Sequence, residues 1–177
     1  MVKFISDIMD SVVILFQERI KVGTVKELIV NPDDGFFLGF VVSQYSKEDD
    51  KVVLLKNVKG FGNGIVMIDE YGALSDFNDI VEIEKTYPNN PEILKAKVVT
   101  ESDQKIGKVA DATVSLDSKK LEKIYVEPNL SVRFLSNQLI IPKNKIVKIE
   151  KKKIIVSDEF IAVKDKKVGV AQAAAID

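Results

Sequence analysis

Apolar and polar residues alternate along much of this chain with the period of two that is typical of β-strands. The segment 111–117, DATVSLD, is the clearest case, because Ala112, Val114 and Leu116 alternate there with polar residues. Turns rich in Pro, Asn, Asp and Gly separate such segments, as NPDDG does at residues 31–35. Many short strands joined by turns predict a mainly β protein built from small antiparallel barrels, with few and short helical turns.

One helical turn is expected close to the N-terminus. Ser6 is a candidate N-cap residue, and Ile5, Ile8 and Met9 would then pack inward before the chain becomes extended at Val12.

The chain contains an internal repeat, because IKVGTVKELIV at residues 20–30 returns as KIGKVADATVS at residues 105–115. Aligning Gly23 with Gly107, 84 positions later, gives a match that runs without a gap for more than twenty residues. Two similar units, packed with approximate two-fold symmetry, are therefore expected. The other matched pairs are Val22 and Ile106, Val25 and Val109, Val30 and Val114, Asp33 and Asp117, Phe40 and Ile124, and Val42 and Val126.

Two features of the repeated segment predict local backbone geometry. Val25 and Val109 fall out of the alternation at the same place in both copies, which indicates a β-bulge. Gly23 and Gly107 precede it, and we interpret them as structural residues of the repeat, at sites where a Cβ atom would block close packing. A phosphate-binding loop is not indicated, because neither copy has several glycines that open a helix.

Later strands complete each copy, and a segment rich in Pro and Asn, EKTYPNNPEIL, separates the two copies. In the first copy we expect a third strand at 52–55 and a closing strand at 65–69. The counterparts in the second copy are 139–142 and 154–158. The predicted organisation is a first unit at residues 1–85, a linker at 86–92, a second unit at 93–160 and a C-terminal tail at 161–177.

Residue types that are missing from the chain exclude several kinds of chemistry. It has no Cys, no His and no Trp, so disulfides, thiolate metal sites, thiol nucleophiles and histidine bases are all excluded. Two carboxylate pairs remain, Asp69 with Glu70 and Asp76 with Asp79, and we interpret them as surface features because no partner base accompanies them. We therefore expect no enzymatic activity, no cofactor and no metal ion.

The apolar N-terminal segment does not predict membrane insertion. Asp7 and Asp10 interrupt it before a signal peptide or a membrane-spanning helix is complete. The expected location is the cytoplasm.

Charge is distributed unevenly between the two halves of the chain. Residues 1–90 carry 9 basic and 15 acidic residues, a net charge of −6, whereas residues 91–177 carry 17 and 12, a net charge of +5. The basic stretch at 142–153 ends in Lys151, Lys152 and Lys153, which are candidate partner-binding residues for an acidic protein or RNA. The alternative interpretation is a solvated turn between two apolar strands, where lysines deter aggregation.

A second candidate for partner binding is Phe61. It lies between glycines in GFGNG, residues 60–64, which we interpret as a contact loop or as a cap on the first barrel.

The repeated phrases VGTVKELIVNPDDG and IGKVADATVSLD, together with the closing Ile-x-Val-x-Asp pattern, resemble the PRC-barrel family. The resemblance covers about residues 8–70 and 93–159, and it implies two barrels of this type in tandem. Members of this family are non-catalytic barrels that dock on partner proteins. The second unit is also similar to the end of a ribosome maturation factor that pairs two barrels, but TYPNNPEILKAKVV departs from that factor's pattern between the barrels.

These observations together predict a cytoplasmic binding or scaffolding module that docks on a protein partner. The alternative is an RNA-processing or ribosome-assembly factor that acts through the basic second unit. Nucleic acid is the less favoured partner, because few aromatic residues lie near the lysines. Assembly into a homo-oligomer is left open by the sequence.

Overall fold

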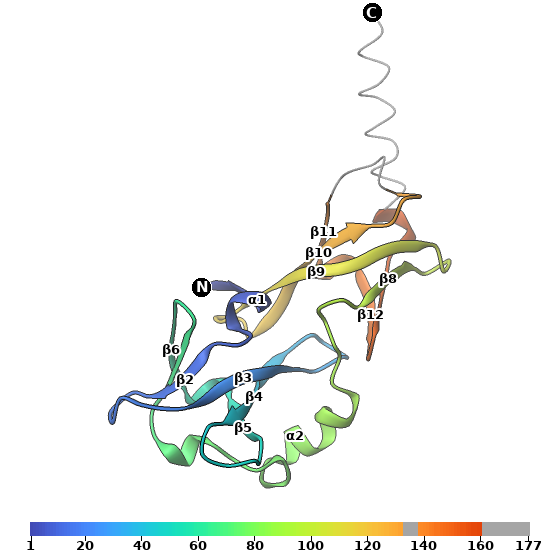
Figure 1. Cartoon of the computed structure of the whole chain (residues 1–177). Helices are drawn as coiled ribbons and strands as arrows, with labels where there is room; N and C mark the ends of the chain where they lie inside the picture. Colours follow the sequence, from blue (N-terminus) through green and yellow to red (C-terminus); the bar gives the residue numbers. More distant parts are fainter. Residues whose placement is uncertain (133–137, 161–177) are drawn as a thin grey trace, which may run out of the picture. The chain divides into compact units, whose positions relative to one another are not determined.

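The computed structural model describes residues 1–132 and 138–160 (Figure 1). The chain divides into two compact units. Unit 1 contains Met1–Pro91 and also Thr113–Leu121, whereas unit 2 contains Glu92–Ala112 and continues from Glu122. The domain limits expected from the sequence stay a prediction. They assign residues 113–121 to the second unit, whereas the structure groups these residues with unit 1. The predicted tail at 161–177 lies outside the described residues.

Unit 1 is built on a six-stranded sheet with the order β5-β4-β3-β2-β7-β6. Neighbouring strands are antiparallel except β2 and β7, which run parallel. A short strand and one helical turn precede the sheet, and five further short helical segments lie within or after it. The elements are β1 (Val2–Phe4), α1 (Ile5–Ile8), β2 (Val12–Leu15), β3 (Ile20–Val30), β4 (Phe37–Gln44), β5 (Lys51–Leu54), η1 (Leu55–Asn57), β6 (Val58–Gly62), β7 (Ile65–Ile68), η2 (Tyr71–Ala73), η3 (Phe77–Asp79), α2 (Val81–Thr86) and η4 (Tyr87–Asn89).

The second sheet repeats this order of strands as β11-β10-β9-β8-β13-β12, and β8 and β13 are again parallel. The predicted mainly β fold of two small barrel-like sheets is therefore confirmed. The tip of the β9–β10 hairpin is the part that belongs to unit 1, where β1 pairs with the end of β9. The elements are β8 (Lys97–Thr100), β9 (Lys105–Ser115), β10 (Lys120–Pro128), β11 (Leu139–Pro142), η5 (Lys143–Lys145), β12 (Ile146–Glu150) and β13 (Lys153–Val156).

The two copies also share backbone conformations that are rare for residues other than glycine. Asp10 and Lys95 have φ angles of 60° and 66°, and their N–H groups donate to the carbonyl oxygens of Val25 and Val109. Because left-handed backbone is costly for such residues, its return at matched places indicates that the same backbone path is imposed on both copies. Two further matched pairs with positive φ are Arg19 with Asp103 and Gly35 with Lys119.

Close backbone packing surrounds the glycine of each repeated segment. A Cβ atom at Gly23 would collide with the carbonyl oxygen of Ser43, and one at Gly107 would collide with the carbonyl oxygen of Glu127. The colliding atoms are themselves 84 positions apart, and each belongs to the strand that follows in the sheet or to its end. A carbonyl oxygen within a β-ladder has little room to move, so glycine is required at both sites.

The bulge expected near Val25 is present, because the pairing of β3 with β4 shifts between Val25 and Glu27. A second shift occurs where β3 pairs with β2, between Val13 and Ile14. The pairing of β8 with β9 shifts at the corresponding place, between Val98 and Val99. These bulges let one long central strand bend as it pairs with both of its neighbours.

Three expectations about local structure need correction or extension. The helical turn α1 begins at Ile5 without a side-chain cap, so the proposed N-cap role of Ser6 was wrong, although Ile5 and Ile8 are buried as expected. Phe61 does not lie in a loop but in β6, where it pairs with Val66 of β7. Strand β6 and its counterpart β12 were not predicted, because glycines and lysines interrupt their apolar pattern.

Unit 1 has an additional apolar layer outside its sheet. Residues 71–89 form short helical segments that follow β7, and α2 lies against the face of β3, β4 and β5 (Figure 1). Their apolar side chains bury this face of the sheet, which explains why β4 reads as a continuous apolar run. The buried residues of this cluster are Ile29, Leu38, Val41, Val52 and Ile83, and Phe36, Leu54, Phe77, Ile80 and Tyr87 pack against them.

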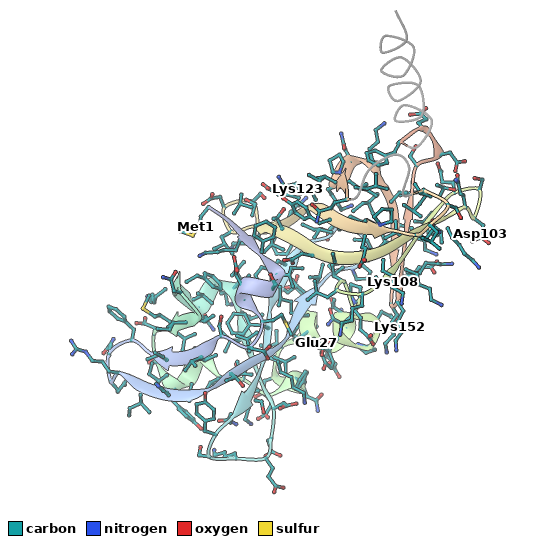
Figure 2. All side chains as sticks on the ribbon, turned by 45° about the horizontal axis from the view of Figure 1, so that its top comes forward. Met1, Glu27, Asp103, Lys108, Lys123 and Lys152 are labelled. Carbon is teal, nitrogen blue, oxygen red and sulfur yellow. The ribbon has the colours of Figure 1, made fainter. Side chains whose placement is uncertain are left out.

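A polar network around Asn90 holds this layer on β3. The buried Asn90 amide donates to the carbonyl oxygen of Leu28 at 2.8 Å and to Glu27 Oε1 at 2.7 Å, while its Oδ1 accepts the N–H of Val30 at 2.9 Å. The Tyr87 hydroxyl donates to Glu27 Oε2 at 3.0 Å (Figure 2 labels Glu27). Burial, together with the charge of Glu27, raises the pKa of Tyr87 to about 12.

Replacement of Gly23 by Ala should lower the free energy of unfolding by about 1–3 kcal/mol, because the new Cβ atom must displace a backbone carbonyl group. Gly62→Ala is the matched control, since its Cβ would meet only ordinary contacts with Ile65. Chemical denaturation measures both changes. An equal loss in the two variants would contradict this explanation of Gly23.

The Tyr87 phenol should titrate near pH 12 in the folded protein, and ultraviolet difference spectra of the Tyr87→Phe variant should lack that transition. The folded-state pKa is raised, so the stabilising contribution is complete below the unfolded-state pKa of about 10. It should be lost as the pH rises from there through about 12. Denaturation of the wild type and of Tyr87→Phe over this range tests the direction. A wild type that loses no more stability than the variant would contradict it.

Candidate protein-docking surfaces

The three candidate lysines lie where the sequence placed them, at the turn between β12 and β13. Lys151 and Lys152 form the turn and Lys153 begins β13. The Nζ atom of Lys152 is 3.4 Å from Glu92 Oε1, and that of Lys153 is 3.2 Å from Glu150 Oε2. These pairs are largely exposed and contribute little to stability. A role of the lysines in binding stays a prediction.

Phe61 is half-buried in β6, at the edge of the sheet of unit 1. Its strand is irregular, because the pairing with β7 shifts between Val58 and Gly60. A bulged edge strand that carries a lysine, Lys59, is a common protection against pairing with other chains. Phe61 lies in unit 1, and the three lysines lie in unit 2.

Four large and exposed side chains gather at one end of the sheet of unit 1, and we call this surface the apolar end. They are between 47% and 58% exposed. Tyrosine and phenylalanine are enriched in the energetically important parts of protein interfaces, so their exposure here is informative. The apolar end consists of Phe16, Ile20, Tyr45 and Tyr71.

Backbone pairing brings these residues to the same end of the sheet. Ile20 begins β3 and pairs with Leu15, the last residue of β2. The N–H of Phe16 donates to the carbonyl oxygen of Ile68 at the end of β7, at 2.8 Å. The N–H of Tyr45, which follows β4, donates at 3.1 Å to Val22 of β3.

The Tyr71 ring is held in place by two polar contacts. Its hydroxyl group donates to Gln44 Oε1 at 3.1 Å, and the Nζ atom of Lys47 lies 5.7 Å from the centre of the ring. The Gln44 amide in turn donates to the carbonyl oxygen of Asp49 at 3.0 Å. An aromatic ring that is already ordered loses less entropy when a partner covers it.

A shallow polar pocket lies beside this end, and it contains the first of the two carboxylate pairs. Lys59 Nζ is 2.9 Å from Asp69 Oδ2, and this hydrogen bond lowers the pKa of Asp69. The carboxylate is therefore charged at neutral pH and is poorly suited to act as a proton donor. Within residues 1–132 and 138–160, no group of three acidic residues could hold a metal ion. The pocket is lined by Lys56, Asn57, Lys59, Asp69, Glu70, Gly72 and Ala73.

Two matched positions at the corresponding end of the second sheet are polar. Glu101 donates its N–H to the carbonyl oxygen of Val156, just as Phe16 donates to Ile68. Asn129 donates its N–H to Ile106 in the place of Tyr45. The same backbone therefore forms without aromatic residues at these positions, so the fold does not require them in unit 1.

The apolar end was not predicted from the sequence. Part of the signal was present in the aligned copies, where Tyr45 stands against Asn129. At the same offset Phe16 stands against Thr100, and only the backbone hydrogen bonds match it to Glu101. A difference in residue type between the copies indicates a binding surface only when both positions are known to be exposed. Exposure depends on the folded structure.

The two sheets define a class of protein, a small β-barrel module. Residues 90–159 match the family model of the PRC-barrel domain, so this part of the chain is a PRC-barrel domain. The match contains strands β8 to β13 and confirms the family suggested by the repeated phrases. No curated protein matches the chain.

No helix in the described part of the chain is long and apolar enough to cross a membrane.

Proposed function

We propose that this protein is a non-catalytic cytoplasmic binding module, built from two PRC-barrels, that docks on a protein partner through the apolar end of unit 1. The observation that carries the proposal is the contrast between the two sheets at equivalent positions. Aromatic residues are exposed at this end of unit 1, whereas unit 2 has Glu101 and Asn129 on the same backbone. Exposed aromatic side chains that the fold does not need are best explained by a partner that buries them.

Three independent similarities between the units support the proposal that unit 1 is a PRC-barrel as well. The order of strands is the same in both sheets. Gly23 and Gly107 are each closed in by a carbonyl oxygen of the following strand segment. Left-handed residues recur at matched turns. Together they make a second copy of the same module the simplest account of unit 1.

The proposed absence of catalysis is based on the ion pairing and charge of the acidic side chains. Asp69 is paired with Lys59, and Asp76 is paired with Lys51, whose Nζ atom is 2.5 Å from Asp76 Oδ1. The Lys51 pKa is raised by this hydrogen bond, so the ammonium group is charged as well. Exposed ion pairs of this kind are common on protein surfaces, and they keep these groups charged instead of poised for proton transfer at neutral pH.

Exchange of two residues between the units tests the apolar end. The double variant Phe16→Glu, Tyr45→Asn gives unit 1 the side chains of unit 2 at equivalent positions, so the fold should be kept. Capture of the protein partner from native lysate should fall about tenfold or more, because two central apolar contacts are lost. Val147→Thr, at another exposed apolar residue, is the control and should bind as the wild type. Unchanged capture by the double variant would refute the proposed surface.

The salt dependence of capture distinguishes the main proposal from the RNA alternative. Apolar docking should persist at high salt, whereas phosphate contacts weaken steeply. The triple variant Lys151→Gln, Lys152→Gln, Lys153→Gln should keep the fold and slow association with the partner at low salt only. Binding kinetics at two ionic strengths measure this effect. Capture that is lost at high salt and after nuclease treatment would instead support the RNA-processing or ribosome-assembly role.

A further inference from the structure

The outer face of β4 and β5 in unit 1 is covered by the chain itself. Val41 of β4 pairs with Val52 of β5, and both are buried on the side that faces α2. Ile80, Ile83 and Tyr87 supply the covering side chains. Their spacing of three and four residues is that of one face of a helix.

The equivalent pair in unit 2 is Tyr125 of β10 and Ile140 of β11. The neighbouring pair Ile124 with Ile141 corresponds to Phe40 with Val53, which places Tyr125 where Val41 stands and Ile140 where Val52 stands. The register is therefore the same in both sheets.

This pair is not buried as its counterpart is. Ile140 is 46% exposed and Tyr125 is half-buried. The described residues after β13 end in a helical turn at residues 158–160, and no element comparable to α2 is described in unit 2. We call the face formed by Lys123, Tyr125, Ile140 and Pro142 the outer face of unit 2; Figure 2 labels Lys123.

We propose that the outer face of unit 2 binds an amphipathic helix of a partner protein. The helix would place two or three large apolar side chains, at the spacing seen in α2, on Ile140 and Tyr125. Unit 1 supplies the argument for this occupant, because the same face of the same strand arrangement takes a short helix there. Burial of apolar surface at Ile140 and Tyr125 would favour binding of such a helix.

The charge of the face selects among such helices. Lys123 projects from the centre of β10 with its Nζ atom 5.7 Å from the centre of the Tyr125 ring, and Lys143 follows Pro142 directly. In unit 1 the place of Lys123 is taken by Gly39, which carries no charge. The partner helix therefore carries a carboxylate that faces Lys123, which increases specificity and the rate of association. This surface shares no residue with the apolar end, so variants can test the two proposals independently.

A peptide with the sequence of residues 76–91, which contains α2 and four acidic residues, is the probe. Titrated into the isotope-labelled full-length chain, it should shift the NMR signals of Ile140 and Tyr125 in a saturable manner. Ile140→Glu should weaken binding about tenfold or more, because a carboxylate replaces an apolar contact. Val147→Glu is the matched control on β12 and should leave binding unchanged. Circular dichroism verifies that both variants are folded.

A second measurement changes the peptide and leaves the outer face of unit 2 unaltered. Replacing Ile80 and Ile83 of the peptide by Asp should abolish the shifts at Ile140, if the apolar side of the helix makes the contact. Lys123→Gln should weaken binding of the unchanged peptide at low salt. Absence of binding, or equal binding by both peptides, would overturn the proposal.

Other occupants of the face are distinguished by a spin label. The chain has no Cys, so Lys143→Cys gives a single labelling site beside Pro142. Broadening of the peptide's signals upon binding supports the proposal. Broadening of residues 161–177 in the chain alone would show that the chain covers its own face, and concentration-dependent broadening between copies would show a homodimer. Either of these two results overturns the assignment to a partner helix.

Discussion

The close approach of two backbones at a glycine is the contact on which each sheet depends. At Gly23 and at Gly107 the long central strand comes so near to the following strand segment that a carbonyl oxygen occupies the space of a side chain. The bulges beside this point bend the strand. One strand can then pair with both of its antiparallel neighbours while the sheet curves, which is how a small sheet begins to close on itself.

Because the closing contact uses only backbone atoms and a glycine, it leaves the outer surfaces of each sheet free to differ. Unit 1 covers its outer face with α2 and fastens it through Asn90 and Tyr87. The buried amide of Asn90 satisfies a carbonyl and an N–H group of β3 at once, which a water molecule would otherwise have to do. Unit 2 has Tyr125 and Ile140 at the matched positions and keeps part of them in contact with solvent. Two copies of one backbone therefore present different surfaces.

The proposed interactions use these differences rather than the shared framework. The apolar end has aromatic residues where the other unit has Glu101 and Asn129, and the outer face of unit 2 has a lysine where unit 1 has Gly39. A repeated module commonly carries its stability in the conserved geometry and its specificity in the surface. In this chain the two units have the same backbone geometry and differ in their surface side chains.

The sequence by itself determined the repeat, the mainly β fold and the family, because alternation and the Gly-x-Val phrase are local patterns that survive in a linear reading. It also placed Lys151 and Lys152 at a turn. Only the tertiary structure decided that Phe61 lies in a strand, that residues 113–121 belong to unit 1, and that Phe16 and Tyr45 meet at one end of the sheet. These facts depend on pairing between distant strands and on what covers each face, and neither is a property of a local segment.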